Sequence, residues 1–258
     1  MSIASTMVAP ANTDVSNSLT RLSDSITHTN DSIGRAIVSC LNHFEAKANA
    51  RGIRLEIHTD FKQLANINEH LDKLPLTSQF DPVYSEIGPH NGFWIKGIDS
   101  RGEIVHTQAV RFDDLTGTYL AAHLKSLKAF YENPEKSAHP EETCDAQAPA
   151  TFSITGRVCY QGEMWLKKEG YRGRDLAMIL PKISMALTLA RWSPDYLYGT
   201  VQAGIVEKGV VAKYGHYNVQ PHGIIYNCKR TNEFLDEWIE WVNWREIVDQ
   251  IERSVLYQ

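Results

Sequence analysis

The chain has 258 residues, of which 43% are hydrophobic and 22% are charged, with a formal net charge of −5 at pH 7. This composition predicts an ordinary globular protein with room for one large domain and additions at both ends. The acidic balance argues against nucleic acid as a partner, because a protein that binds the phosphate backbone carries a basic face. No apolar run approaches the roughly 18 residues of a membrane span, and the amino terminus lacks a basic-then-apolar secretion signal. We therefore expect a cytoplasmic protein without a membrane span.

Cysteines and histidines give no sign of a metal site. Cys40, Cys144, Cys159 and Cys228 are widely spaced and form no CxxC pair, so we expect free thiols in a reducing compartment. The ten histidines contain no HxH or HExxH spacing, which would place two of them on one face of a helix or strand. We expect no bound metal.

The amino-terminal half alternates between helical and strand patterns. Residues 1–30 are rich in Ser, Thr, Asn and Asp, which predicts a mobile arm or a helix that orders only on contact. From Asp31, apolar residues recur at helical spacing as far as Gly52, which fits a helix cap. Periodicity and turn residues then predict a strand at 53–58, a helix at 61–71 capped by Asp60, a proline-marked loop at 74–89, a hairpin of strands at 92–98 and 104–112, a helix at 118–132 and a surface loop at 133–150.

The carboxyl-terminal half centres on a unit of strand, loop and helix. A strand at 152–166 is followed by a basic loop at 167–174 and then by a helix that begins at Asp175. Such a unit presents unpaired backbone N–H groups and the positive end of the helix dipole to an anionic ligand. Pro181 should kink this helix or displace its start. The later patterns predict a strand at 196–201, a helix at 203–214, a strand at 217–226 and a tryptophan-rich helix at 233–255.

The loop before this helix resembles that of a known family. Residues 171–177 read Tyr-Arg-Gly-Arg-Asp-Leu-Ala and resemble the acyl-CoA pyrophosphate loop of the GNAT acyltransferase superfamily, whose pattern is Arg or Gln, two residues, Gly, one residue, and Gly or Ala. Arg172 and Ala177 match the pattern, whereas Asp175 stands in place of the inner glycine. A carboxylate about 4 Å from a phosphate costs around 4 kcal/mol near a protein surface. Either Asp175 turns away, or the donor sits differently, or Asp175 is only a helix N-cap beside solvated arginines.

The resemblance implies a fold and a donor site. It covers residues 53–226 by element order and implies an α+β domain with a mixed, mostly antiparallel sheet whose fourth and fifth strands splay apart to admit the donor. We therefore divide the chain into a mobile arm at 1–30, a GNAT-like domain at 31–230 and an addition at 231–258, whose helix packs on the domain or on a partner in a homodimer. The implied donor is acetyl-CoA or another acyl-CoA. Its implied binding residues are Trp165, Leu166, Arg172, Gly173, Arg174, Asp175, Leu176 and Ala177.

The implied chemistry is amine acylation, which needs a base for the ammonium, a hydrogen-bond donor to the thioester oxygen and an acid for the thiolate. Family members often carry a carboxylate on the strand before the loop, so Glu163 is the candidate base; the alternative is a solvent-facing or ion-paired carboxylate. Gly162 beside it indicates a bulge that would open the splay, or room for a neighbouring tryptophan. The usual tyrosine acid falls at Val211. The nearby substitutes, which otherwise serve only in packing, are Tyr214, His216 and Tyr217.

Three functional interpretations follow. The first is an N-acyltransferase that moves an acyl group from acyl-CoA to a small amine or amino acid. The second keeps the fold but takes the acyl group from an acyl carrier protein, as N-acyl amino acid and autoinducer-type synthases do; an acidic carrier would then meet Lys167, Lys168, Arg172 and Arg174, unless these are merely solvated. The third is a ligand-binding relative without transfer activity, because fold alone does not fix function.

Overall fold

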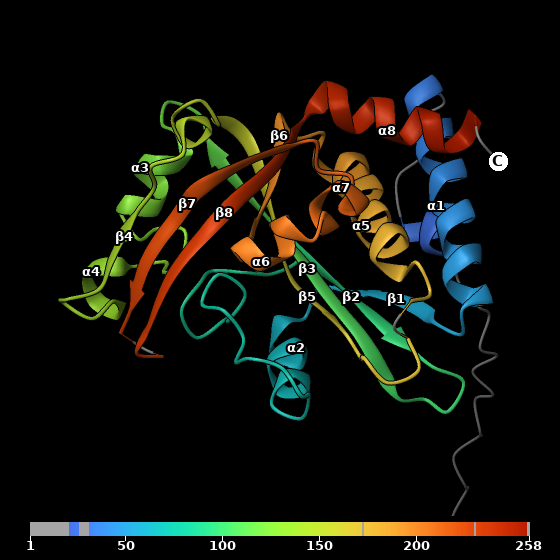
Figure 1. The fold of residues 1–258 in the computed structure, drawn as a ribbon, viewed down its shortest axis with the longest axis horizontal. Helices are drawn as coiled ribbons and strands as arrows, with labels where there is room; N and C mark the ends of the chain where they lie inside the picture. Colours follow the sequence, from blue (N-terminus) through green and yellow to red (C-terminus); the bar gives the residue numbers. More distant parts are fainter. Residues whose placement is uncertain (1–20, 26–30, 172, 230, 257–258) are drawn as a thin grey trace, which may run out of the picture.

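Eight strands form a single mixed sheet in the computed structural model, which describes residues 21–25, 31–171, 173–229 and 231–256. Their order across the sheet is β1-β2-β3-β5-β6-β8-β7-β4, and β5–β6 is the one parallel pair among these described strands (Figure 1). The expected α+β class with a mostly antiparallel sheet is therefore confirmed. The strands are β1 (Arg54–His58), β2 (Gly92–Ile98), β3 (Ile104–Leu115), β4 (Thr143–Asp145), β5 (Gly156–Leu166), β6 (Tyr196–Val201), β7 (Asn218–Cys228) and β8 (Glu233–Asn243).

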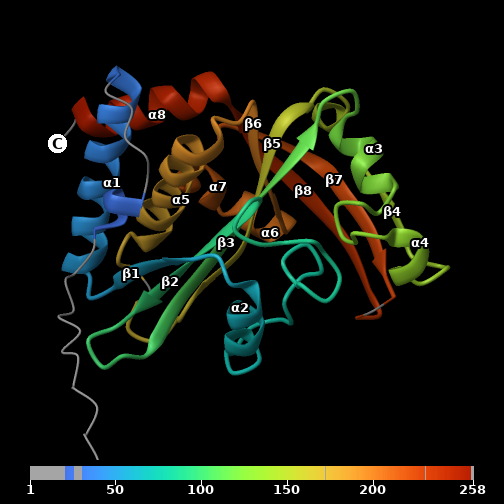
Figure 2. The ribbon, with the colours of Figure 1, turned by 180° about the vertical axis from the view of Figure 1, so that it is seen from behind.

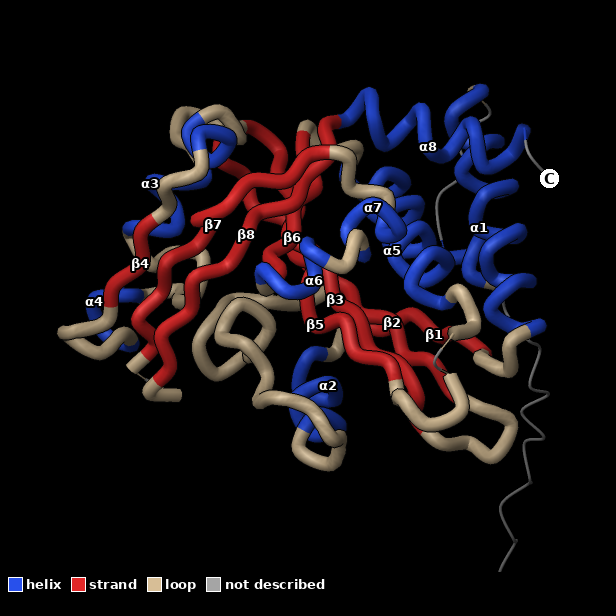
Figure 3. The backbone as a smooth tube through the Cα atoms, viewed as in Figure 1, coloured by secondary structure: helices blue, strands red, loops and turns tan. Residues whose placement is uncertain are grey.

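Helices cover both faces of the sheet. Three long helices, α1, α5 and α8, lie together over one face, and Figures 2 and 3 show them as one group beside β1 to β3. A core cluster fills the space between them and the sheet, and a second cluster lies on the other face under α2, α3 and the chain around residue 80. The described helices are α1 (Ser32–Ala50), α2 (Phe61–Asn68), α3 (Leu120–Lys125), α4 (Pro134–Ser137), α5 (Leu176–Trp192), α6 (Ala203–Glu207), α7 (Val210–Tyr214), α8 (Trp244–Leu256) and the 3-10 helices η1 (Leu22–Ser25) and η2 (Pro149–Phe152). Within the described ranges, no helix has the length and apolarity to cross a lipid bilayer.

Local sequence signals explain why α1 and α2 begin where they do. The side chain of Asp31 accepts a hydrogen bond from the amide of Gly34 at 2.7 Å, and that of Asp60 accepts one from the amide of Lys62 at 2.9 Å. Each carboxylate satisfies an otherwise unpaired amide and favours the helix dipole. Both predicted helix starts are confirmed. The hairpin turn is confirmed as well, with the amide of Asp99 bonded to the carbonyl of Glu103 at 2.9 Å.

The predicted helix at 233–255 is wrong over its first half. Residues 233–243 form β8, which lies between β6 and β7, and α8 begins only at Trp244. The strand buries Ile239 and Val242 on opposite faces of the sheet. An element that is apolar on both faces has the composition of a central strand, and its aromatic and β-branched residues suit a pleated surface.

Other predicted elements differ in extent, among them the helix at 61–71, which ends at Asn68, and the strand at 152–166, which begins at Gly156. The helix at 118–132 shortens to α3, the loop at 133–150 contains α4 and β4, and the helix at 203–214 divides into α6 and α7. Gly209 separates these last two helices with a φ of +67°, a left-handed conformation that interrupts a helix. Pro181 stays inside a continuous α5.

The amino-terminal arm is anchored where it is described. Residues 1–20 and 26–30, for which a mobile arm is predicted, lie outside the described residues. In η1, Leu22 is only 3% exposed and joins the core under α1. The hydroxyl of Ser23 also lies 3.2 Å from the side-chain oxygen of Asn42 on α1. This short helix is therefore part of the packed structure.

Replacing Leu22 by Ala should lower the free energy of unfolding by about 2–4 kcal/mol, because it leaves a cavity under α1. Urea denaturation measures the change. Leu74→Ala is the matched control, since Leu74 is 67% exposed, and it should change stability by no more than about 0.5 kcal/mol. Equal effects of the two substitutions would mean that η1 is not docked.

Candidate active site

The centre of the candidate site is the place where β5 and β6 separate. The two strands pair only through Val158–Tyr196, Cys159–Leu197 and Tyr160–Tyr198. Beyond Tyr160, β5 continues to Leu166 while pairing with β3 alone, and β6 continues to Val201 while pairing with β8 alone. The edges of β5 and β6 that face each other are therefore not paired with a strand beyond this point. Their backbone N–H and C=O groups need other hydrogen-bond partners. The splay that the GNAT resemblance implies is confirmed.

A bulge on β5 lies on the diverging part of the strand. Thr107 pairs with Trp165 and Ala109 pairs with Gly162, so Glu163 and Met164 together face a single residue of β3. Glu163 has a φ of +55°, as the extra residue of a bulge often does. The predicted bulge is present, one residue after Gly162.

Gly162 makes room for a ring. A Cβ atom at this position would lie 2.8 Å from Phe80 and 3.1 Å from Tyr160. These two aromatic rings stack with centroids 5.5 Å apart, so the glycine serves Phe80 and Tyr160, not a neighbouring tryptophan.

Glu163, the candidate base from the sequence, is held in an ion pair. Its carboxylate lies 2.6 Å from the ammonium of Lys73 and accepts a hydrogen bond from the amide of Thr77 at 2.9 Å. The side chain is 3% exposed. Both carboxylate oxygens are therefore engaged by fixed partners on the segment after α2. The side chain instead ties the segment after α2 to β5, together with a bond from the indole of Trp165 to the carbonyl of Asp72 at 3.1 Å.

Asp175 turns away from the start of α5. Its φ is +57°, and its side chain caps no amide of the helix. The carboxylate is 63% exposed and lies 3.8 Å from the guanidinium of Arg51 on α1. The amides of Leu176 and Ala177 are thus not capped by Asp175, so they remain available to an anion. The N-cap alternative for Asp175 is not observed.

The arginines of the loop have separate places. Arg174 donates to the carbonyl of Arg51 at 3.0 Å, and its guanidinium lies 5.2 Å from the ring centroid of Tyr171. Gly173 has a φ of +78°, a left-handed turn that suits glycine. Arg172 lies outside the described residues.

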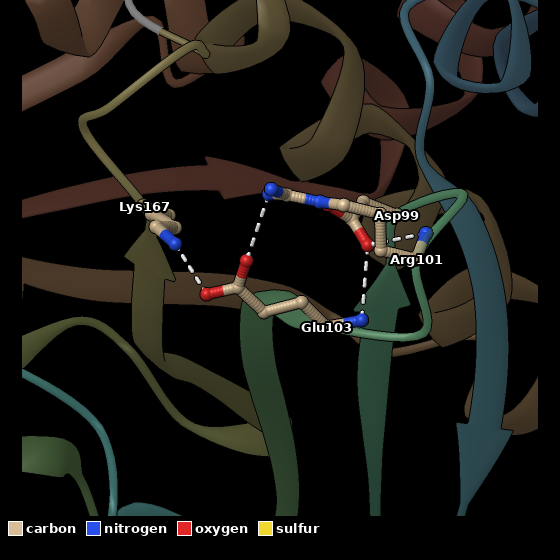
Figure 4. A network of polar contacts seen from close by, with 4 residues as sticks. All are labelled: Asp99, Arg101, Glu103 and Lys167. Atoms are coloured by element: carbon tan, nitrogen blue, oxygen red, sulfur yellow. Dashed lines mark hydrogen bonds and ion pairs between the residues drawn. The ribbon is translucent and has the colours of Figure 1, made fainter.

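A charged network fixes the first residue of the loop to the β2–β3 hairpin (Figure 4). Lys167 pairs with Glu103, and Arg101 bridges Glu103 at 3.0 Å and Asp99 at 3.1 Å. Asp99 also accepts the amides of Arg101 and Glu103, each at 2.9 Å, and these bonds help to lower its pKa. Lys167 is therefore neutralised by a hairpin carboxylate.

One face of the sheet at the splay is the face that α5 covers. There His216 and Glu240 are both fully buried, with Nδ1 of the imidazole 2.9 Å from Oε1 of the carboxylate, outside hydrogen-bond alignment. A Cβ on Gly199 would lie 3.0 Å from this Oε1 and 3.3 Å from the carbonyl of Gln161. The pair thus adjoins the point where β5 and β6 part. Nε2 of His216 and Oε2 of Glu240 have no hydrogen-bond partner among the described residues.

The opposite face of the sheet is the face that α2 covers. Here the hydroxyl of Thr200 lies 3.5 Å from that of Tyr160 and hydrogen-bonds to Glu237 of β8. Burial raises the pKa of the Glu237 carboxyl, and the Thr200 bond offsets this only in part. A carboxylate with a raised pKa is a stronger base, and this one lies beside the splay.

The two tyrosine candidates lie farther from this arrangement. Burial raises the pKa of Tyr214, with a further contribution from Glu240, so its hydroxyl stays protonated. Tyr217 is 54% exposed and faces a pocket near α1 and α8. Val211, at the place of the usual acid, is buried. Of the three substitutes, His216 contacts a buried carboxylate, at 2.9 Å from Glu240.

Nowhere in the described residues do three or more His, Cys, Asp or Glu side chains converge as a metal site would require. The four cysteines are free thiols, and all are buried.

Sequence reasoning missed Glu237 and Glu240 because their segment was interpreted as a helix. The available signal was the even spacing of Leu235, Ile239 and Trp241, which lie on one face of β8. Residues three apart on a strand point to opposite faces, so β8 supplies one carboxylate to each side of the splay.

Comparisons with known proteins find similar solved structures. No protein-family model matches the chain, and no curated protein sequence matches it. FeeM, an N-acyl amino acid synthase from uncultured soil microbes, is 9% identical with a TM-score of 0.42, over 80% of this chain and 99% of its own. The spermidine N-acetyltransferase SpeG of Vibrio cholerae is 8% identical with a TM-score of 0.41, over 77% and 98%.

A third similar structure is AAC(6')-Ib in complex with paromomycin and acetyl-CoA, 10% identical with a TM-score of 0.40, over 76% of this chain and 95% of its own. FeeM and SpeG are named as N-acyl-group transfer enzymes, and the AAC(6')-Ib complex holds acetyl-CoA. TM-scores near 0.4 carry no argument about function or substrate, which must come from strand order and site geometry.

Replacing Asp175 by Gly should leave the free energy of unfolding unchanged or raise it by up to about 1 kcal/mol. Glycine relieves the cost of a left-handed residue, and the lost ion pair with Arg51 is exposed and weak. Thermal unfolding measures the change. A melting temperature that falls by several degrees would show that Asp175 caps α5 after all.

Replacing Glu237 by Gln should stabilise the protein above the ordinary pKa of a glutamate. Because the folded state raises the pKa of Glu237, its ionisation costs stability as the pH rises from the unfolded value through the folded value. The variant should therefore gain over the wild type between pH 4 and pH 8, as urea unfolding at both pH values would measure. A constant difference would mean that Glu237 is not desolvated.

Proposed function

We propose that this chain is an N-acyltransferase that moves an acyl group from acyl-CoA to a small amine or amino acid. The observation that carries the proposal is the separation of β5 and β6 after three residue pairs, beside a helix start whose amides Asp175 leaves uncapped. The opening between β5 and β6 offers backbone N–H and C=O groups without a strand partner, and these can hydrogen-bond to the amides in the arm of CoA. The start of α5 suits its pyrophosphate.

The donor would lie between α5 and the diverging strands. Its pyrophosphate would meet the backbone from Gly173 to Ala177, with Arg172 and Arg174 supplying charge. Trp165 and Leu166, at the end of β5, would line the path of the arm toward the bulge. Backbone groups at the bulge would stabilise negative charge on the thioester oxygen.

The reaction would use a different carboxylate on each face of the sheet. Glu237 takes a proton from the acceptor ammonium, with Thr200 and Tyr160 beside it, and the free amine then attacks the thioester carbonyl carbon. The tetrahedral intermediate collapses as its carbon–sulfur bond breaks, which leaves an amide. His216, which lies against Glu240, gives a proton to the departing thiolate. The nitrogen loses two protons in all: the first leaves through Glu237 to solvent, and the second, lost from the tetrahedral intermediate, balances the proton gained at sulfur.

A donor carried by an acyl carrier protein is the second candidate. It is favoured by Asp175, because a carboxylate near the phosphate matters less when the adenine nucleotide is absent. It is disfavoured by charge, because Lys167 is engaged by Glu103 and Arg174 packs against Arg51 and Tyr171. A carrier helix would find a smaller basic surface than the sequence offers, so CoA is the first choice.

Titration with CoA, acetyl-CoA and longer acyl-CoAs tests the donor. A ligand at a hundred times its dissociation constant stabilises the folded state by about 2.7 kcal/mol, which thermal unfolding would detect. Thiol release with a panel of amines then tests transfer. Binding of a carrier protein without any response to CoA would favour the synthase, and silence in all assays would favour a non-catalytic protein.

Replacing Glu237 by Gln should lower kcat by about 10²- to 10⁴-fold and remove the acidic limb of the pH profile. Asp236→Asn is the matched control, because Asp236 neighbours Glu237 but pairs with His222 on the exposed side, and it should keep wild-type rates. Glu163→Gln should affect stability more than rate. An active Glu237→Gln beside an inactive, folded Glu163→Gln would return the role of base to Glu163.

A further inference from the structure

A basic pocket lies between α1, α5 and α8, apart from the splay. Its volume is about 460 Å³. Four permanently cationic side chains line it: Lys47 and Arg51 from α1, Lys182 from α5 and Arg253 from α8. Among its lining residues, all of them described, Asp175 alone carries a carboxylate. The N-terminal and C-terminal helices thus build the pocket together with the first turns of α5.

Two of these cations lack a carboxylate to balance them. Arg51 lies 3.8 Å from Asp175, and Arg253 pairs with Asp249 at 2.9 Å. For Lys47 and Lys182, no carboxylate of the described ranges lies within ion-pair distance. Their ammonium groups lie 5.7 Å and 5.4 Å from the centroid of the same ring, that of Phe44. Two uncompensated charges therefore face one pocket.

The protonation behaviour of the pocket agrees with this excess of positive charge. Burial lowers the pKa of Lys182, and the neighbouring charge of Lys47 lowers it further, against an opposing effect of Cys40. His43, also in the lining, has its pKa lowered by burial and then by Lys47 and Lys182. An anion in the pocket would offset the repulsion that Lys47 and Lys182 exert on each other and on a protonated His43.

We infer that this pocket binds the phosphate group of a nucleotide-like ligand between Lys47 and Lys182. Charge-assisted bonds from two ammonium groups suit a phosphate monoester, which carries nearly two negative charges at neutral pH. The rim adds a surface for a planar ring, because Met178 and Tyr217 are 40% and 54% exposed and both line the pocket. A ring next to a phosphate describes a nucleotide.

Two sources could supply such a group. One is the 3'-phosphoadenosine of CoA, because Asp175 belongs both to this pocket and to the start of α5 where the donor is proposed. The other is a free nucleotide that binds independently of the transfer reaction. The inference about the pocket holds in either case and does not require the proposed function.

Calorimetric titration with adenosine 3',5'-bisphosphate tests the inference on the full chain. The wild type should bind it, and Lys47→Gln and Lys182→Gln should each weaken binding by about ten-fold or more, the effect of a charged hydrogen bond. Lys136→Gln on α4 is the matched control, since Lys136 is exposed and distant from the pocket, and it should bind as the wild type does. Absence of binding to the wild type, or equal affinity in all four proteins, would overturn the inference.

CoA and 3'-dephospho-CoA distinguish the two sources. If the pocket holds the CoA phosphate, both pocket variants weaken CoA and leave 3'-dephospho-CoA unchanged. If it holds a free nucleotide, CoA and its dephospho form bind alike in every protein while the bisphosphate still loses affinity. Transfer activity with 3'-dephospho-CoA reports separately on the proposed reaction.

Folding of the variants can be verified without ligand. Lys47 is exposed, so Lys47→Gln should melt as the wild type does. Lys182→Gln removes a partly buried charge, and its melting temperature should stay the same or rise. The affinity of Lys47→Gln then decides the inference even if Lys182→Gln were to misfold.

Discussion

The parallel pairing of β5 and β6 is the constraint on which the rest of the structure depends. It lasts for three residue pairs, and then β3 holds one strand while β8 holds the other. Each strand keeps a full partner on its outer side, so the inner edges can separate without unfolding either strand. The opening is therefore a property of the sheet register and needs no ligand to create it.

β8 gives this opening its chemistry. It is the strand that backs β6, and its side chains alternate between a face under α5 and a face under α2. Glu240 lies against a buried imidazole on the first face, and on the second face Glu237 hydrogen-bonds to Thr200, whose hydroxyl lies 3.5 Å from that of Tyr160. A single strand thus equips both sides of the slot with acid–base groups held by a rigid element, which preserves their geometry.

The sequence predicted the bounds of an element where turn or loop residues flanked it, and it misled where one segment satisfied two periodicities. Strands β2 and β6 have the predicted bounds, because turn or loop residues flank both. β8 was interpreted as a helix because Phe234, Trp238, Trp241 and Val242 also satisfy helical spacing, while the carboxylate of Glu237 interrupts the apolar alternation of a strand. The position of Glu237 is therefore one reason why the strand was not predicted. The ion pairs of Asp175 and Glu163 are made with Arg51 and Lys73, which are distant in sequence, so no local pattern predicts them.

Attachment of the segment after α2 to β5 fixes one wall of the opening. Phe80 stacks on Tyr160, Lys73 and Thr77 hold Glu163, and the carbonyl of Asp72 accepts a hydrogen bond from Trp165. The contacts of the protein itself thus give this wall a set contour, and a ligand that met it would lose little ordering entropy there. In the acyltransferase that we propose, such a wall would select amines by their shape.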